Sequence, residues 1–378
     1  MALVLNEEQQ LLKDSAEGFF GEKAPVSQLR QLRDDQDDNC FSKPLWGEMA
    51  EMGFSGILVS EEHGGVDFGM VGASVVAEAM GKNLSASPFH ASSIVSASII
   101  ALGGNDQQKG QMLPAIAAGE MLVTLAVDEQ GLHNPEGSSL KAEASEGGYK
   151  LTGLKTFVQE GGTADKIIVL ARTSGEAGDK DGLSLFVVDR RAGGLIVDQT
   201  VMTDSRGWAK MTFEGVQVDA DALLGEEGGA MAALDPALDK ARIVLAAEML
   251  GMAQECLDVT VAYLKERKQF GVLIGTFQGL QHRAAELFSE IEVTRSVVLK
   301  ASQMADMGGD VSWFASLAKA KACKTVELAT NEAIQMHGGI GMTDEFDFGF
   351  FIKRARVVQA LYGDYGYHAD RFANRSGY

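Results

Sequence analysis

Residues 235–270 read DPALDKARIVLAAEMLGMAQECLDVTVAYLKERKQF, and this stretch decides the architecture of the chain. Asp235 suits a helix N-cap, and Pro236 suits the first helical position. No further proline follows before about Phe270, so the segment predicts one helix of roughly 33 residues, about 50 Å long. The segments Phe277–Met307 and Val311–Met336 have the same helical spacing and short links that contain glycine. Long helices with short links favour an antiparallel bundle.

Upstream of this bundle the hydrophobic period changes from helical to alternating. Short runs rich in β-branched and aromatic residues are separated by glycine-containing turns, which is typical of strands. We expect a small antiparallel sheet of about six strands. The predicted strands are Met121–Val127, Tyr149–Val158, Lys166–Arg172, Leu183–Val188, Leu195–Val201 and Ala209–Val218.

The N-terminal part of the chain returns to a helical period. The predicted helices are Glu7–Phe20, Lys43–Met52, Met70–Gly81, Pro88–Leu102 and Asp106–Ala118. The fold class expected is therefore mostly α with a central β domain. The predicted domains are an N-terminal helical domain (1–119), a middle β domain (120–225) and a C-terminal helix bundle (226–378).

Composition excludes several classes of function. The net charge of −20 disfavours non-specific binding to nucleic acid or to an anionic membrane, since both need a basic face. The three cysteines lie far apart, which indicates neither a disulfide framework nor a zinc site. The histidines show no HxH or HExxH spacing, so no metal is expected. Without an apolar leader or a run long enough to span a bilayer, a cytoplasmic protein is the simple interpretation.

Three local motifs resemble those of the acyl-CoA dehydrogenase family. They are GILVSEEHGG at 56–65, RKQFG at 267–271 followed by Gln278, and QMHGGIG at 335–341. The resemblance covers essentially the whole chain. It implies an N-terminal helical domain, a small antiparallel β domain and a C-terminal four-helix bundle. It also implies FAD as cofactor, α,β-desaturation of an acyl-CoA thioester, an oligomer, and electron-transferring flavoprotein as the electron acceptor.

The second and third motifs suit a dinucleotide. A diphosphate favours the guanidinium of Arg267 and backbone N–H groups exposed at Gly338 and Gly339. The structural alternative is a solvated helix-end arginine and a simple C-cap turn. By resemblance these motifs extend into the flavin site of a neighbouring subunit. The residues expected to bind the cofactor from this end are Arg267, Gln269, Phe270, Gln278, Gln335, Gly338 and Gly339.

The elements that a family subunit uses for its own flavin are altered. Where the family has a threonine on an early strand, this chain has Asp128 after Val127. Where the family often has Trp-x-Ser/Thr, this chain has Phe157-Val158-Gln159, so the hydroxyl is lost. Val127, Asp128, Phe157 and Gln159 are therefore the cofactor residues expected from the β domain. A carboxylate at position 128 places a negative charge near the expected flavin.

The catalytic base of the family is not present at either of its usual places. One branch carries a glutamate after an Ile-Tyr-like pair, and that position falls on Gly363, after Tyr362. By resemblance the loop is one residue longer than the family's, which makes Asp364 the first candidate base. A second branch places its glutamate before an arginine, and here Ala241 precedes Arg242.

Glu248 is the second candidate base. It lies on the same helix face as Ala241, two turns further along, in an otherwise apolar stretch. The alternatives are a turn aspartate at position 364 and a salt bridge from Glu248 to a neighbouring helix. Arg242 and Tyr362 are the expected substrate-binding residues.

Three functional hypotheses remain open from the sequence. The first is an acyl-CoA dehydrogenase, in a homo-oligomer or beside a second acyl-CoA dehydrogenase subunit. The altered loop resembles that of small subunits of pimeloyl-, dicarboxylyl- or steroid-side-chain-type enzymes, which points to an unusual acyl group. The second is a non-desaturating relative such as an oxidase or an acyl-CoA desulfinase. The third is a non-catalytic subunit that completes a partner's FAD site.

Overall fold

The computed structural model describes residues 3–378, which separate into two compact units. One unit contains the residues up to Gln31 together with Met70–Ser85 and Arg242–Tyr378. The other contains Leu32–Gly69 and Ala86–Ala241. These units interleave along the sequence, and the division into three consecutive domains at 119 and 225 stays a prediction.

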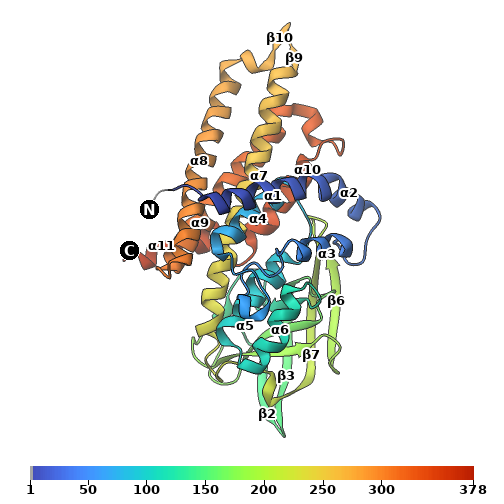
Figure 1. Ribbon diagram of the computed structural model, residues 1–378, viewed down its shortest axis with the longest axis vertical. Coiled ribbons are helices and arrows are strands. Elements are labelled where there is room, and N and C mark those ends of the chain that lie inside the picture. Colours follow the sequence, from blue (N-terminus) through green and yellow to red (C-terminus); the bar gives the residue numbers. More distant parts are fainter. Residues whose placement is uncertain (1–2) are drawn as a thin grey trace. The chain divides into compact units, whose positions relative to one another are not determined.

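The first unit is a bundle of long helices (Figure 1). Helices α8 and α9 run side by side, and the Thr294 and Thr325 hydroxyls meet 2.7 Å apart between them. The Asp310 side chain caps α9 by accepting a hydrogen bond from the Trp313 N–H at 3.3 Å. The elements are α1 (Glu7–Lys23), α2 (Val26–Asp34), α4 (Gly69–Asn83), α7 (Met231–Glu266), β9 (Lys268–Gln269), β10 (Val272–Leu273), η5 (Ile274–Thr276), α8 (Gln278–Asp306), α9 (Val311–His337), η6 (Gly338–Met342), α10 (Phe348–Ala360) and α11 (Tyr365–Arg375), with α2 and α7 continuing into the other unit.

Helices α4 and α7 approach each other closely enough for backbone contact. A Cβ atom added to Gly81 of α4 would lie 2.1 Å from the carbonyl oxygen of Glu248. A Cβ added to Gly251 of α7 would lie 1.9 Å from the carbonyl oxygen of Glu78. Each helix therefore presents a glycine to the backbone of the other, and no larger residue fits at either position.

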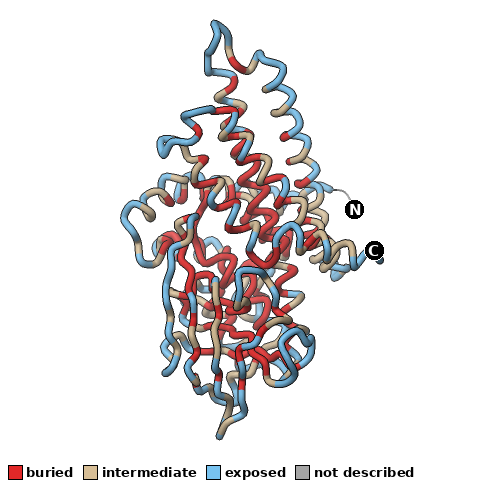
Figure 2. The backbone as a smooth tube through the Cα atoms, turned by 180° about the vertical axis from the view of Figure 1, so that it is seen from behind, coloured by how far each residue is buried: buried red, intermediate tan, exposed pale blue. Residues whose placement is uncertain are grey.

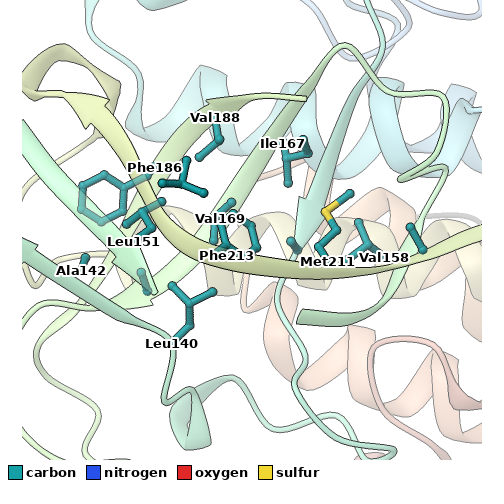
Figure 3. Close-up of a cluster of buried hydrophobic side chains, with 14 residues drawn as sticks. Leu140, Ala142, Leu151, Val158, Ile167, Val169, Phe186, Val188, Met211 and Phe213 are labelled. Carbon is teal, nitrogen blue, oxygen red and sulfur yellow. The ribbon is translucent and has the colours of Figure 1, made fainter. Parts of the chain in front are cut away.

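The second unit is built on an eight-stranded sheet with the order β6-β7-β3-β2-β4-β5-β8, in which β1 pairs with β4. Most neighbours are antiparallel, but β1 and β2 each pair with β4 in parallel. One face buries a cluster of aliphatic and aromatic side chains that includes Leu151, Val169 and Phe186 (Figure 3). The strands are β1 (Val123–Ala126), β2 (Lys141–Ser145), β3 (Gly148–Gln159), β4 (Lys166–Arg172), β5 (Leu183–Asp189), β6 (Leu195–Val201), β7 (Gly207–Asp219) and β8 (Leu223–Leu224).

Short helices complete this second unit. They are α3 (Lys43–Glu51), η1 (Glu61–His63), η2 (Phe89–Ser96), α5 (Ala97–Gly103), α6 (Asp106–Ala117), η3 (Pro135–Gly137) and η4 (Ala220–Ala222). The segment η2 is a π-helix, and it is buried throughout. Within residues 3–378 we find no helix with the length and the apolar character needed to cross a membrane.

The structure confirms the mostly α class with a central β unit and corrects some details. Strand β2 was missed because its Lys-Ala-Glu-Ala-Ser sequence lacks β-branched and aromatic residues. The two-residue strand β8 was not predicted either, so the sheet is larger than the six strands expected, and it is not purely antiparallel. Helix α7 begins at Met231, one turn before the predicted cap, so Asp235 and Pro236 lie inside its first turns. The predicted helix Pro88–Leu102 divides into η2 and α5.

Replacing Gly251 with alanine tests the close crossing of α4 and α7. The new methyl group would collide with the Glu78 carbonyl, so we expect the free energy of unfolding to fall by about 1–3 kcal/mol, as for other overpacked sites. The matched control is Gly18→Ala in α1, where the position is exposed and no atom lies within 4 Å. This control should be neutral or stabilising by up to about 1 kcal/mol. Urea unfolding with equal losses in both variants would contradict the crossing.

Candidate active site

The predicted dinucleotide-binding residues of the C-terminal motifs gather at one end of the bundle. A small apolar cluster of Leu264, Ile274 and Met336 joins the ends of α7 and α9 to η5 at this end. The Tyr263 ring stacks on His337, with 4.1 Å between ring centroids. This support holds the chain on either side of the RKQFG motif and anchors the QMHGGIG motif through its own Met336 and His337. The sequence-predicted residues are therefore brought together.

The side chains on this support face outward. Arg267, Gln278 and Gln335 are exposed, as are Gln269 and both glycines of the QMHGGIG motif. Phe270 is 90% exposed at the tip of the β9–β10 hairpin, and pale blue predominates at this end of the bundle in Figure 2. A Cβ at Gly338 or Gly339 would meet nothing within 4 Å, so the backbone there is open to a ligand. We name this exposed set, residues 267–271, 278, 335 and 338–339, the bundle tip.

Strand β3 is irregular where the β domain is expected to contact the cofactor. Its pairing with β7 shifts register between Lys155 and Val158. At the shift Phe157 adopts a φ of 51° and remains 50% exposed, although a large apolar side chain normally avoids both. Gln159 is buried, with its side-chain oxygen lacking a hydrogen-bond partner among the described residues. The structure thus presents the Phe157 ring at the surface and turns Gln159 inward.

The Asp128 carboxylate is hydrogen-bonded within its own turn, to His133 and Asn134. Both of its oxygens lie 3.0 Å from Nδ1 of His133, and it also accepts a hydrogen bond from the Asn134 N–H at 3.1 Å. The His133 side chain is only 2% exposed. The negative charge that the sequence places near the cofactor is therefore engaged by neighbouring donors, which weakens the argument that it repels a flavin.

A buried ion pair that the sequence analysis missed holds the following loop. The Lys155 ammonium donates to the Val127 carbonyl at 3.0 Å and to Glu129 at 2.8 Å. Burial lowers the pKa of Lys155 to about 8, although the Glu129 carboxylate opposes this shift. Burial by itself raises the pKa of Glu129. The Lys155 charge and the hydrogen bonds from Ser139 and Leu140 outweigh burial and lower that pKa to about 2. Both groups are charged at neutral pH, and they tie the loop after Val127 to β3.

Two buried cations hold the loop that carries the family's base position. Lys319 of α9 donates to the carbonyls of Gln359, Leu361 and Gly363 at 3.1, 3.0 and 2.9 Å. Arg242 of α7 donates to the Tyr362 carbonyl at 3.0 Å. Burial lowers the pKa of Lys319, and these carbonyls take the place of water around its charge. Arg242 thus contacts Tyr362 as a structural partner, through its backbone.

A buried histidine completes the support of the same carbonyl. Nε2 of His368 lies 3.1 Å from the Tyr362 oxygen. Burial and the neighbouring charges of Lys319 and Arg242 lower the pKa of His368 well below its usual range, so the ring is neutral. Neutral Nε2 carries the proton and donates it to the carbonyl. Neither Lys319 nor His368 stood out in the sequence, because a lysine or histidine within a helical pattern resembles a surface residue.

The loop gives the first candidate base, Asp364, another role. Its side chain accepts a hydrogen bond from the Tyr367 N–H at 2.8 Å and so caps α11. The residue is exposed, whereas a base for a weakly acidic α-proton needs a dry site. This placement favours the turn aspartate that the sequence also allowed.

The second candidate, Glu248, forms a bidentate salt bridge with Arg354. The Arg354 guanidinium donates through Nε to one carboxylate oxygen at 2.7 Å and through Nη2 to the other at 2.9 Å. Both side chains are 1% exposed. The pair joins α7 to α10, and it favours the structural role over the base.

Comparison with known proteins identifies the family. Residues 6–120, 127–216 and 227–377 match the N-terminal, middle and C-terminal domains of acyl-CoA dehydrogenases. The chain belongs to the acyl-CoA dehydrogenase family. It is accordingly an FAD-dependent oxidoreductase by family, and desaturation of acyl-CoA thioesters is the family's reaction.

Individual relatives resemble the chain over nearly its whole length. The mitochondrial isobutyryl-CoA dehydrogenase of Dictyostelium discoideum is 28% identical over 368 residues, which cover 95% of this chain and 86% of the relative. The butyryl-CoA dehydrogenase of Megasphaera elsdenii superposes with a TM-score of 0.92 at 25% identity, covering 100% of both chains. The Tcur3481-Tcur3483 steroid ACAD superposes with a TM-score of 0.87 at 28% identity, covering 98% of both chains.

The donors of this acyl-CoA dehydrogenase fit a dinucleotide. A guanidinium, amide side chains and open backbone at the bundle tip are the groups that bind a diphosphate and an adenosine. Bound FAD would accept the β-hydrogen of the acyl chain as a hydride. Within the β unit, the exposed Phe157 ring is a surface that a flat cofactor could cover.

Substitution of Glu248 separates its two proposed roles. Glu248→Gln leaves Arg354 buried without its carboxylate, so we expect the free energy of unfolding to fall by about 3–5 kcal/mol. The control Glu327→Gln breaks an exposed pair with Arg356 and should cost less than about 1 kcal/mol.

The double variant Glu248→Leu/Arg354→Met should recover most of the loss, since apolar replacement of a buried pair is often neutral. Urea unfolding measures all of these variants. A Glu248→Gln protein of unchanged stability that reduces flavin more slowly would instead assign the base to Glu248.

Proposed function

We propose that this protein desaturates an acyl-CoA thioester with FAD, as one subunit of an oligomer in which its bundle tip completes the flavin site of a neighbouring subunit. The observation that carries the proposal is the bundle tip itself. Arg267, Gln278 and Gln335 project into solvent from a packed aromatic and aliphatic support. A preorganised set of donors whose side chains face solvent suits a ligand held by another chain.

The charge distribution supports an extended partner contact at this end. The chain has a net charge of −20, yet residues 265–268 at the end of α7 read Lys-Glu-Arg-Lys, with three positive charges and one negative charge. Phe270 packs edge-on against Phe277, with 6.3 Å between ring centroids, and both rings are exposed. A local cationic and aromatic surface on an acidic protein is complementary in charge to an acidic subunit that holds a dinucleotide.

The neighbouring subunit is either a second copy or a different acyl-CoA dehydrogenase chain. The name of the Tcur3481-Tcur3483 steroid ACAD joins two gene products, which supports a mixed assembly for this chain as well. The absence of a glutamate at positions 363 and 241 also favours a partner chain with a complete site. An acyl group of the dicarboxylyl or steroid-side-chain type, with electron-transferring flavoprotein as acceptor, remains our expectation for the substrate and the redox partner.

A non-catalytic role is the second candidate, and a specific observation favours it. Asp364 is exposed and caps α11, while Glu248 is bound to Arg354, so neither predicted base is available in this conformation. A chain of this kind could complete its partner's flavin site and leave its own site idle.

Cofactor and substrate assays test the proposed function directly. We expect the protein, alone or co-expressed with its partner, to release FAD on denaturation. We also expect anaerobic addition of an acyl-CoA from a panel of straight, dicarboxylyl and steroid side chains to bleach the flavin absorbance. Flavin per chain, measured beside light-scattering mass, separates a complete site in every chain from a shared one. If the protein contains FAD but no acyl-CoA in the panel reduces it, the remaining hypotheses are the structural role and a non-desaturating reaction.

Arg267 provides a sharper test of the bundle tip. Arg267→Ala removes a charge-assisted hydrogen bond to the diphosphate, worth about 1.5–3 kcal/mol, so FAD affinity should fall about 10- to 100-fold. Titration of the flavin-free protein with FAD, followed by flavin fluorescence, measures this change. The matched control is Arg356→Ala, since Arg356 is an exposed arginine that binds Glu327 on the side of the bundle. Equal affinity for both variants would remove the bundle tip from the cofactor site.

A further inference from the structure

The ring of His337 is enclosed by aromatic side chains next to the bundle tip. It stacks on Tyr263 with 4.1 Å between ring centroids, and its centroid lies 4.5 Å from that of Phe348 and 5.2 Å from that of Phe346. We name these three rings the aromatic cage. His337 is only 4% exposed, and as the last residue of α9 it leads directly into the two glycines of the bundle tip. A titratable ring is thus buried where the chain begins to expose its donors.

The turn after α9 folds back onto this histidine. Gly338 turns the chain with a φ of 64°, which favours glycine. A Cβ atom added to Gly341 would lie 3.0 Å from Cβ of His337 and 2.9 Å from the Ile334 carbonyl oxygen. Because the turn packs this closely on His337, a displacement of the ring also moves the backbone at Gly338 and Gly339.

The hydrogen bonds of the ring define its protonation. Nδ1 of His337 lies 2.7 Å from the Ala333 carbonyl oxygen, which can only accept, so Nδ1 carries the proton. Nε2 is buried, and it has no hydrogen-bond partner among the described residues. A second proton on Nε2 would create a charged N–H group without an acceptor in apolar surroundings, which is far more costly than a bare nitrogen.

Two features favour a cation at this place, but burial outweighs them. The ring stands at the C-terminal end of α9, where the helix dipole favours positive charge, and the Ala333 carbonyl also favours an imidazolium. Burial nevertheless lowers the pKa of His337 below the ordinary histidine value of about 6.5, so the ring is neutral at neutral pH. Protonation therefore drives the ring out of the aromatic cage instead of charging it in place.

The charged groups on the segments around the ring have other partners or face solvent. Glu332 of α9 binds Arg283 at 2.6 Å. Asp344 and Asp347, in the link before α10, bind Arg30 at 2.8 and 2.7 Å. The other ionisable groups on these segments are Lys265 and Glu266 of α7, Arg267, Glu345 and Lys353, which are exposed, and Arg354, which binds Glu248. Within residues 3–378 no carboxylate accepts from Nε2, so no counter-ion is in place for an imidazolium.

We propose that His337 is a positioning residue whose neutral ring holds the bundle tip in the conformation that binds FAD, and that its protonation releases the turn and weakens binding. The inference rests on the proposed function above, in which the bundle tip contacts the diphosphate. Proton and cofactor then exclude each other at this end of the bundle. By linkage, bound FAD also lowers the affinity of His337 for its second proton.

The pH dependence of FAD affinity tests this inference. The flavin-free assembly is titrated with FAD at about pH 7.5 and about pH 5.5, on either side of the ordinary histidine pKa. Flavin fluorescence measures the affinity, and circular dichroism shows whether the fold is retained at both values. Wild-type affinity should fall about tenfold at the lower pH, because one linked proton shifts an equilibrium by up to about tenfold per pH unit.

Two variants that cannot titrate should abolish this loss. His337→Phe keeps an aromatic ring in the cage, and His337→Asn keeps an amide donor for the Ala333 carbonyl. Both should bind FAD equally at the two pH values, and either one suffices if the other fails to fold. The matched control is His282→Gln, since His282 is exposed on α8, and it should retain the wild-type loss.

The opposite results are distinct from one another. Wild-type affinity that stays constant, or a loss that both His337 variants retain, overturns the inference and leaves the proposed function intact. Affinity that rises at the lower pH in the wild type alone places a charged ring beside the diphosphate, and it overturns the inference as well. An assembly that binds FAD at neither pH overturns the proposed function together with this inference.

Discussion

Backbone contact between α4 and α7 is the constraint on which the helical unit depends. Gly81 and Gly251 let each helix approach the carbonyl of the other, and a single methyl group at either position would separate them. The approach brings Glu78 of α4 within reach of Arg295 of α8, which also binds Gln254 of α7 at 2.7 Å. A contact between backbones has little freedom to adjust, so the axis of α7 is set at the crossing. The positions along α7 then follow from helical geometry.

Two side chains of α7 transmit that constraint toward the site. Glu248 adjoins the crossing and binds Arg354 of α10 through both oxygens. Arg242, six residues earlier and almost two turns along the axis, reaches the Tyr362 carbonyl in the loop that follows α10. The ion pair therefore fixes the helix that precedes the loop, while Arg242 fixes the loop itself. A buried charged pair contributes little net stability, but breaking it is costly, so its value here lies in defining one arrangement.

The sequence predicted the long helices and most strands because their periodicity is strong over many residues. It placed α8 and α9 within one residue of their observed ends, since a glycine-containing link marks the turn between them. It missed β2 because pairing with β3 and β4 decides that strand, not its composition. In the site, sequence motifs found the bundle tip. They could not reveal Lys319, whose partners are backbone carbonyls some forty residues away, or that Asp364 would cap α11.

Buried cations with backbone partners recur wherever a loop of the site must hold its shape. Lys155 donates to the Val127 carbonyl. Lys319 donates to one carbonyl in the last turn of α10 and to two beyond it, and Arg242 donates to the Tyr362 carbonyl between those two. An ammonium or guanidinium away from water must keep its acceptors, because losing one leaves an unpaired buried charge. The cost of unpairing the buried cation therefore keeps such a loop in one conformation, whereas a loop held only by aliphatic contacts shifts more easily. For a reaction that moves a proton and a hydride between fixed atoms, displacements near 1 Å matter. The chain thus uses buried positive charges to fix the backbone of these loops.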